Sequence, residues 1–303
     1  MRESHYIRAG FNQTGNDMGN RIWFITGASS GFGHALAVAV IARGDCAVVA
    51  ARRLTALEDL VRIAPDRVLA APLDVTDPVA RKGAVDMAIA RFGRIDVLAN
   101  IAGRGSVGAV EEFAPEQLQE LMEVNFFAPA ELTREILPYM RRQGHGHVLN
   151  LTSIGGLISI GGFGGYCASK FALEAWSEAL ADEVVTFGIS VTLVEPGNFR
   201  TEFAGDVNMR PSQSLPAYRS IVEPIEEFLY GQAGRQPGDP AKAAAAMIAV
   251  VDDATPPRRL VLGADAYDVL DRTVAARKAD IERYRAMGEE TAFEGAETRS
   301  IGA

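Results

Sequence analysis

The chain has 303 residues, of which 48% are hydrophobic, so it can bury a sizeable core in one large α/β domain or two smaller ones. Its net charge of −9 argues against a broad nucleic-acid-binding surface, although it allows a local basic pocket for one phosphate. Two cysteines, Cys46 and Cys167, are too few for a disulfide scaffold or a structural zinc cluster, and they indicate a reducing, cytoplasmic setting. No apolar run is long enough to predict a membrane span.

Residues 1–20 are polar, lack the apolar stretch of a signal peptide, and are expected to form a flexible N-terminal extension. After them, short apolar strands alternate with helical patterns. Strands are predicted over residues 21–26, 46–51, 67–71 and 95–100, and helices over residues 31–43, 54–62 and 78–92. Asp77 is expected to cap the third helix, with Pro78 at its first position.

A long helical region follows over residues 115–142, which Pro129 and Pro138 should kink or break. Further strands are predicted over residues 147–152, 189–195 and 259–262, and further helices over residues 166–187, from Pro240 behind the cap Asp239, and over residues 264–285. Between them, residues 196–238 look less regular. Strands that are apolar throughout, each followed by a helix, predict a doubly wound parallel sheet of the Rossmann type, with about seven strands and helices on both faces. We expect one domain over residues 21–303.

A glycine-rich turn, TGASSGFG at residues 26–33, joins the first predicted strand to the first helix. Glycine lets the backbone turn tightly and approach a pyrophosphate, while the helix start presents free N–H groups to it. An ordinary glycine turn is the alternative, but the placement between strand and helix favours a dinucleotide site. The predicted cofactor contacts in this turn are Gly27, Ser29, Ser30, Gly31, Phe32 and Gly33.

The second strand ends in Arg52 and Arg53, where an NAD site would carry a carboxylate for the ribose 2′-hydroxyl. A guanidinium can instead bind a 2′-phosphate through paired hydrogen bonds. The sequence therefore predicts NADP(H) in preference to NAD(H), with Arg52 as the main contact and Arg53 as a helper. The alternative is that both arginines belong to a solvated loop.

Tyr166 and Lys170 lie four residues apart on a predicted helix, so they share one face. An ammonium group near a phenol favours the phenolate and lowers the phenol pKa, which suits general acid–base chemistry. Many helices contain such a pair, so alone it is a weak signal.

The motifs taken together resemble one family. TGASSGFG, LDV at residues 73–75, NIAG at 100–103, Asn125, Ser153, YCASK at 166–170 and PGNFRT at 196–201 occur in that order, each on its expected element. This series is similar to that of the short-chain dehydrogenase/reductase family, in its single-domain, simple-Rossmann branch, over about residues 21 to 262. The usual Asn-Asn-Ala-Gly reads Asn100-Ile101-Ala102-Gly103 here, which puts one sheet-stabilising polar contact in doubt.

The resemblance implies a role for each matching position. Ser153 would orient the substrate oxygen, Tyr166 would pass the proton, Lys170 would lower the tyrosine pKa and bind ribose, and Asn125 would hold a relay water. The implied cofactor contacts are, besides Tyr166 and Lys170, Asp74 and Val75 at the adenine, Asn100, Ala102 and Gly103 along the middle, and Pro196, Gly197, Phe199 and Thr201 at the nicotinamide.

Several features have alternative interpretations. His145 and His147 suggest a turn rather than a metal site, and no metal is predicted. Cys167 is expected to point away from the site and to pack. The glycine-rich run over residues 155–165 is either a flexible loop or a pocket wall kept small. Residues 202–238 are expected to form a substrate lid, whose aromatic content hints at an apolar substrate.

These observations predict an NADP-dependent oxidoreductase that transfers a hydride between nicotinamide and a carbonyl or alcohol. A catalytically silent NADPH-binding sensor is the alternative, which the intact Ser153, Tyr166 and Lys170 disfavour. A sugar-nucleotide epimerase is disfavoured by the glycine spacing and by the lack of a substantial C-terminal domain. The resemblance also implies a homodimer or homotetramer, paired through the long helix and the tyrosine-bearing helix.

Overall fold

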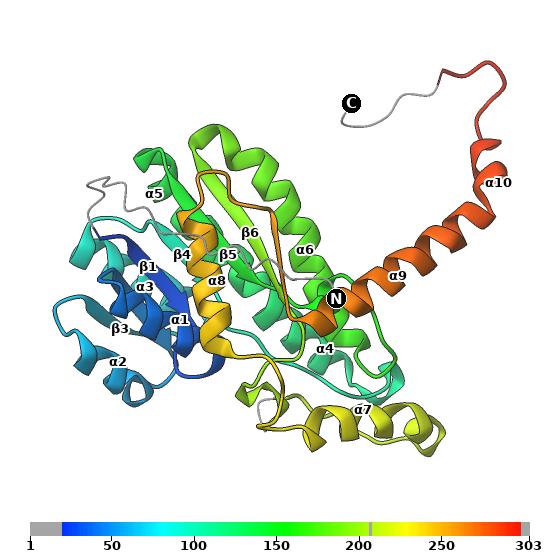
Figure 1. Cartoon of the computed structure of the whole chain (residues 1–303), viewed down its shortest axis with the longest axis horizontal. Helices are drawn as coiled ribbons and strands as arrows, with labels where there is room; N and C mark the ends of the chain where they lie inside the picture. Colours follow the sequence, from blue (N-terminus) through cyan, green and yellow to red (C-terminus); the bar gives the residue numbers. More distant parts are fainter. Residues whose placement is uncertain (1–19, 206–207, 298–303) are drawn as a thin grey trace, which may run out of the picture.

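The computed structural model describes residues 20–205 and 208–297 of the chain (Figure 1). The expected flexible extension therefore lies outside the described residues except for residue 20, and so do two residues of the expected lid.

One sheet of seven strands forms the centre of the molecule, in the order β3-β2-β1-β4-β5-β6-β7. Every neighbouring pair is parallel, which confirms the predicted doubly wound sheet. The strands are β1 (Ile22–Thr26), β2 (Cys46–Ala51), β3 (Val68–Pro72), β4 (Val97–Asn100), β5 (Gly146–Leu151), β6 (Ile189–Pro196) and β7 (Arg259–Leu262).

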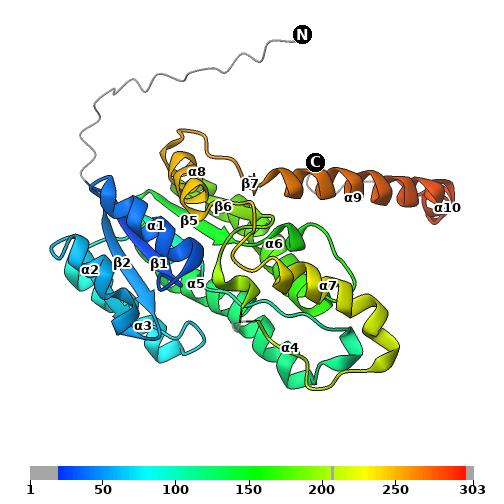
Figure 2. The same cartoon turned by 60° about the horizontal axis from the view of Figure 1, so that its bottom comes forward.

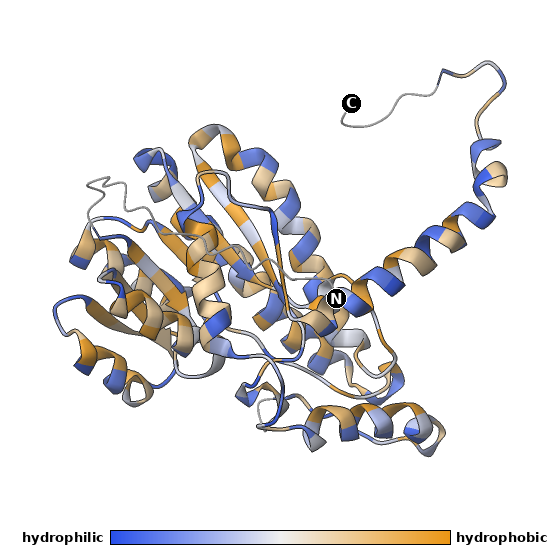
Figure 3. Ribbon diagram, viewed as in Figure 1, coloured by the Kyte–Doolittle hydropathy of each residue, from blue (hydrophilic) through white to orange (hydrophobic). Residues whose placement is uncertain are grey.

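Helices cover both faces of this sheet. One face packs against α1 (Gly31–Ala42), α2 (Glu58–Ile63) and α8 (Pro240–Asp252), and the other against α3 (Pro78–Phe92), α5 (Ala128–Gln143) and α6 (Gly164–Val184). Both faces of a strand are then apolar, which is why the sequence shows continuous apolar runs (Figure 3).

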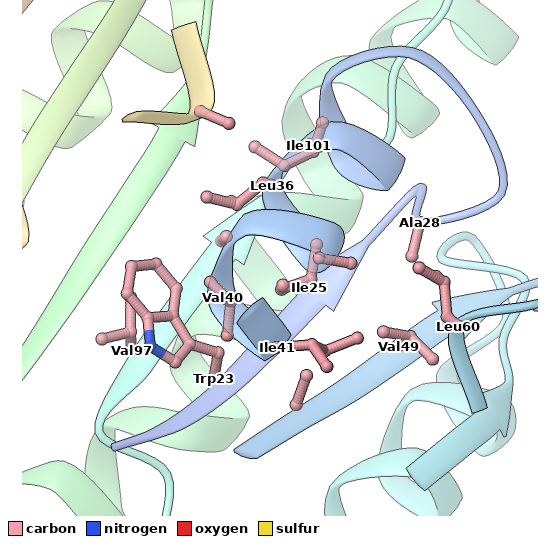
Figure 4. Close-up of a cluster of buried hydrophobic side chains, with 14 of the residues drawn as sticks. Trp23, Ile25, Ala28, Leu36, Val40, Ile41, Val49, Leu60, Val97 and Ile101 are labelled. Carbon is pink, nitrogen blue, oxygen red and sulfur yellow. The ribbon is translucent and has the colours of Figure 1, made fainter. Parts of the chain in front are cut away.

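Strand β1 illustrates how the core is divided. Trp23 and Ile25 pack under α1 and α8, as Figure 4 shows for the first cluster, while Phe24 between them faces the second cluster. All three are fully buried. Because side chains alternate along a strand, one apolar run supplies both layers.

The long helical region predicted over residues 115–142 is divided into α4 (Pro115–Met122), a π-helical turn (Glu123–Phe127) and α5. The interruption falls at the π-helical turn rather than at a proline. Pro129 lies at the start of α5, directly after the π-helical turn, and Pro138 lies inside α5.

The stretch over residues 196–238 is more regular than expected, because it contains α7 (Arg219–Gly231). This helix packs its apolar side against the segment that carries Val107 and Ala109. Figure 2 shows α7 on the same side of the molecule as α4.

The chain continues from β7 into α9 (Ala264–Arg283) and α10 (Arg285–Glu289), which extend away from the rest of the molecule (Figures 1 and 2). Within the part of the chain that the structure describes, no helix combines the length and apolarity needed to cross a bilayer.

Candidate active site

A cavity of about 1050 Å³ opens at the carboxyl ends of the central strands. Its wall runs from the glycine turn after β1 to the segments that follow β5 and β6. The strand order reverses between β1 and β4, and in open parallel sheets the crevice outside such a reversal is where ligands bind.

The glycine turn has the geometry that a pyrophosphate requires. Gly27 and Gly31 adopt positive φ angles of +66° and +53°. A Cβ added to Gly33 would lie 2.3 Å from the carbonyl oxygen of Gly27, so the first turn of α1 folds tightly onto the loop. Ser30 precedes α1 without capping it through its side chain, which leaves the helix N–H groups to face the cavity. Ser29, Ser30, Gly31 and Phe32 line the wall, whereas Gly33 is buried behind it.

The end of β2 brings a positive charge to this cavity. Arg52 lines the wall together with Asp74 and Val75, while Arg53 is exposed, outside the lining residues, just before a short 3-10 turn. A hydrogen bond from the Thr76 hydroxyl, together with the charge of Arg52, lowers the pKa of Asp74. Of the two exposed arginines, Arg52, the expected main contact, lines the cavity, and Arg53, the expected helper, does not.

Asn100 points into the protein rather than into the cavity. Its Nδ2 donates to Asn150 Oδ1 at 2.8 Å and to Thr133 Oγ1 at 3.1 Å, and it is buried. The side chain of Asn100 therefore links β4 to β5 and α5, while Ala102 and Gly103 line the cavity. A cofactor contact of Asn100 stays a prediction.

The family departure at Ile101 is absorbed by the core. Its side chain packs into the cluster under α1, while its N–H donates to Thr26 Oγ1 at 2.9 Å, as does that of Ala102 at 3.0 Å. Thr26 thus ties the loop after β4 to β1, a contact that sequence reasoning did not anticipate.

Ser153, Tyr166 and Lys170 converge on the cavity wall. Ser153 follows β5 and forms a hydrogen bond with the phenol of Tyr166, which stands in the first turn of α6. One turn further along, Lys170 Nζ donates to the main-chain oxygen of Leu151 at 2.9 Å and lies 6.0 Å from the centre of the Tyr166 ring.

Burial dominates the electrostatics of this group. It raises the pKa of Tyr166 above its ordinary value, and the hydrogen bond with Ser153 opposes the rise. Burial also lowers the pKa of Lys170 to about 8, against the effect of the Glu174 carboxylate. In the protein alone, burial therefore shifts the tyrosine pKa in the direction opposite to the lowering expected from Lys170.

Asn125 sits on the π-helical turn and is almost fully buried. Its Nδ2 donates to the Arg104 carbonyl at 2.8 Å and to Ser169 Oγ at 2.9 Å, while its Oδ1 accepts from the Arg104 N–H at 2.8 Å. A Cβ added to Gly103 would lie 3.2 Å from Asn125 Oδ1 and 3.4 Å from Lys170 Nζ. Asn125 is thus held just behind Lys170, outside the lining residues of the cavity.

The segment after β6 closes the opposite wall with Pro196, Gly197, Phe199 and Thr201. Phe199 packs on Phe32 of the glycine turn, with ring centres 5.1 Å apart. Asp265, at the start of α9, accepts a hydrogen bond from the Asn198 N–H at 2.7 Å and so anchors this segment. No sequence motif pointed to Asp265.

Comparison with known proteins agrees with this geometry. The model of the short chain dehydrogenase family matches residues 21–211. The chain belongs to the short-chain dehydrogenase/reductase family. It is 35% identical over 268 residues to Oxidoreductase BOA17 of Botryotinia fuckeliana, which covers 88% of this chain and 97% of that protein. It is 36% identical over 245 residues to a 3-ketodihydrosphingosine reductase of Bacteroides thetaiotaomicron, which covers 80% of this chain and 88% of that protein.

Solved structures show the same fold. A short-chain dehydrogenase from Streptomyces avermitilis superposes with a TM-score of 0.84 at 45% identity, covering 90% of this chain and 99% of that one. More distant members were solved with NAD (Burkholderia phymatum; TM-score 0.76, 23% identity, 93% and 98% covered) and with NADP (Burkholderia cenocepacia; 0.67, 24%, 87% and 97%). This short-chain dehydrogenase/reductase is an NAD(P)-dependent oxidoreductase that acts on CH–OH or C=O groups.

The part of the enzyme's cavity beyond Tyr166 is apolar. Phe203 packs on the Tyr166 ring with centres 5.5 Å apart, and Ile158, Phe163 and Leu229 continue the wall. A Cβ added to Gly155 would lie 3.1 Å from Tyr166 Cε1. The beginning of the glycine-rich run is therefore a wall kept small beside Tyr166, which decides between the two interpretations of that residue.

Two smaller expectations have different outcomes. Cys167 is buried and packs with Tyr166, as expected, but it also lines the cavity. The two histidines do not act together: His145 contacts Asp96 at 3.1 Å, and the buried His147 contacts Thr192 Oγ1 at 2.9 Å. No group of three potential metal ligands occurs among residues 20–205 and 208–297.

Proposed function

We propose that the enzyme is an NADP(H)-preferring carbonyl reductase or alcohol dehydrogenase in which Tyr166 exchanges the proton. The observation that carries this proposal is the convergence of Ser153, Tyr166 and Lys170 on one wall of a cavity that also contains Arg52. The glycine turn fits a pyrophosphate at the intervening position, because Gly27, Gly31 and Gly33 let the backbone approach closely.

The chemistry then divides between cofactor and protein. A bound reduced nicotinamide supplies the hydride. Tyr166 donates its phenolic proton to the substrate oxygen, and the Ser153 hydroxyl donates a second hydrogen bond that holds this oxygen in place. Lys170, whose pKa of about 8 lies near neutrality, stabilises the resulting phenolate and can return a proton to it. Asn125 holds the peptide of Arg104 and thereby fixes the loop beside Lys170.

Replacing Tyr166 tests the catalytic part of this proposal. Tyr166→Phe keeps the ring that packs on Phe203 and removes the proton, so turnover should be lost while NADPH binding, followed by fluorescence titration, is retained. Tyr139→Phe, half-buried on α5 away from the cavity, is the matched control and should keep wild-type turnover. Full activity of Tyr166→Phe would refute the assignment.

The neighbouring arginines test the cofactor preference. Arg52→Asp removes a charged contact to a 2′-phosphate and adds a repulsive charge. A charge-assisted hydrogen bond contributes about 1.5–3 kcal/mol, so the ratio of kcat/KM for NADPH over NADH should fall by at least about tenfold. Arg53→Asp changes the same charge outside the cavity wall and should shift the ratio far less. A wild-type preference for NADH, or equal shifts in both variants, would contradict the proposal.

An apolar carbonyl compound is the proposed substrate, because Ile158, Phe163, Phe203 and Leu229 surround the approach to Tyr166. Screening ketones, aldehydes and alcohols of graded apolar size by NADPH absorbance tests this, and kcat/KM should rise with apolar area. If the protein binds NADPH but turns over no member of such a panel, a sensor role is supported instead. The cytoplasmic location and the homodimer or homotetramer stay predictions.

A further inference from the structure

The C-terminal helices extend away from the body of the molecule (Figure 2), and Arg277 of α9, which donates to the Leu157 carbonyl at 2.7 Å, still contacts it. From Val274 through residue 297 every residue of the described chain is exposed. Helical stability in proteins comes mostly from packing of one apolar face, which the exposed part of these helices lacks within the described chain. This unpartnered helix therefore calls for a covering surface outside the single chain.

The exposed apolar residues of α9 follow a seven-residue repeat. Tyr267, Val274 and Ile281 are 53%, 53% and 67% exposed. Leu270, which is half-buried, and Tyr284, just past the end of α9, lie three residues after the first and the last of them. The same position after Val274 is Arg277, whose guanidinium lies over the Phe171 ring of the body. We call the five apolar residues the α9 stripe. A repeat of seven is the spacing that keeps a seam facing a second helix in a coiled coil, with Tyr267, Val274 and Ile281 at one core position and Leu270 and Tyr284 at the other.

The charges beside the stripe select an antiparallel partner. If two α9 helices run antiparallel and cross at Val274, Tyr267 of one faces Ile281 of the other. Asp271 of each then meets Lys278 of the other, which gives two opposite-charge pairs. Neither Asp271 nor Lys278 has an ion-pair partner within the described chain, whereas the neighbouring Asp268 and Arg272 already pair at 2.9 Å.

A parallel arrangement is less suitable for two reasons. The bodies of both copies would lie at the same end of the helix pair and compete for space, whereas antiparallel helices place them at opposite ends (Figure 1). In a parallel pair the flanking Asp280 of one copy would have to meet Arg285 of the other, and Arg285 already pairs with Glu282 of its own chain at 2.9 Å.

We propose that α9 is a self-association element, through which two copies of this chain pair antiparallel along the α9 stripe about a two-fold axis near Val274. Such a pair is self-complementary, since one surface serves both copies. It is a different contact from pairing through α5 and α6, which the family resemblance implies. A phospholipid surface is a less suitable partner, because the chain carries a net charge of −9 while bilayer-bound helices are typically rich in Lys and Arg.

Charge reversal tests the pairing on the full-length protein. In sedimentation velocity, Asp271→Lys should weaken association and lower the average mass, because the two attractive pairs become repulsive. Combining it with Lys278→Asp restores opposite charges between copies and should return the wild-type mass. A second test is Ile281→Asp, which places a charge on the α9 stripe. Its matched control is Val79→Asp on α3, where Val79 is 79% exposed. Only Ile281→Asp should reduce the average mass. It should halve the mass if α9 forms the only contact between the copies.

Disulfide trapping tests the register. Proteins carrying Tyr267→Cys and Ile281→Cys should cross-link when mixed and oxidised, while each alone should not, because only an antiparallel pair places these positions opposite each other. Cross-linking of each variant with itself would show parallel pairing and overturn the proposal. So would a wild-type mass in Asp271→Lys and Ile281→Asp alike, or a monomer that binds phosphatidylcholine vesicles through the stripe.

Discussion

Gly33 offers the sharpest test of how the dinucleotide crevice is built. It lies in the first turn of α1, and its conformation is helical, so any residue could adopt it. Space alone forbids a side chain: the Cβ of alanine would lie 2.3 Å from Gly27 O, and real Cβ atoms essentially never approach within 3.0 Å. The glycine turn would have to open by about 0.7 Å, the difference between these distances.

Gly33→Ala should therefore reduce both stability and cofactor affinity. Overpacking of a close backbone contact costs about 1–3 kcal/mol in the free energy of unfolding. Displacing one N–H from a phosphate loses a charge-assisted hydrogen bond of about 1.5–3 kcal/mol, which raises the Kd for NADPH by about tenfold or more. Urea unfolding and fluorescence titration measure the two effects.

Gly83→Ala is the matched control, since Gly83 lies in the exposed interior of α3 with nothing within 4 Å of an added Cβ. There alanine should stabilise the enzyme by about 0.5–1 kcal/mol and leave NADPH binding unchanged. The reasoning is refuted if Gly33→Ala unfolds and binds NADPH like the wild type, or if both substitutions shift stability in the same direction.

Two further predictions concern titratable groups. Burial lowers the pKa of His147 from 6.5 to about 4, so stability should fall as pH drops from 6.5 to 4, where only the unfolded chain takes up the proton. His147→Gln should flatten this fall by about 3 kcal/mol in urea titrations, and an unchanged slope would disprove the cause. The Glu174 carboxylate raises the pKa of Lys170, so Glu174→Gln should move the Lys170 limb of the kcat–pH profile to lower pH. Glu174 and the half-exposed Glu178 both pair with Arg259. Glu178→Gln should leave the limb in place, and equal shifts in both variants would count against the explanation.

Most elements of the fold could be predicted because each strand is apolar on both faces. Helix α7 was not predicted, although Val222, Ile225 and Leu229 recur at helical spacing and form its packed side. Pro224 inside the helix and the surrounding polar residues concealed the pattern. The π-helical turn has no comparable sequence signal.

The candidate site was predicted as a set of residues, but the directions of their side chains were not. Asn100 lies two residues after Leu98 on β4, and strand alternation turns both towards the α5 face instead of the cavity. Tyr166 and Lys170 share a helix face as predicted, but their pKa directions depend on burial, which four-residue spacing does not reveal.

The π-helical turn between α4 and α5 determines how far α4 is rotated about its own axis relative to α5. It inserts one extra residue into the winding, and deleting a residue there would rotate α4 by about 100° relative to α5. Because α5 is anchored on the sheet, the rotation would carry Asn125 away from the Arg104 peptide and turn Leu121 out of its packing beside Tyr166. The segment should therefore accept substitutions more readily than changes in length.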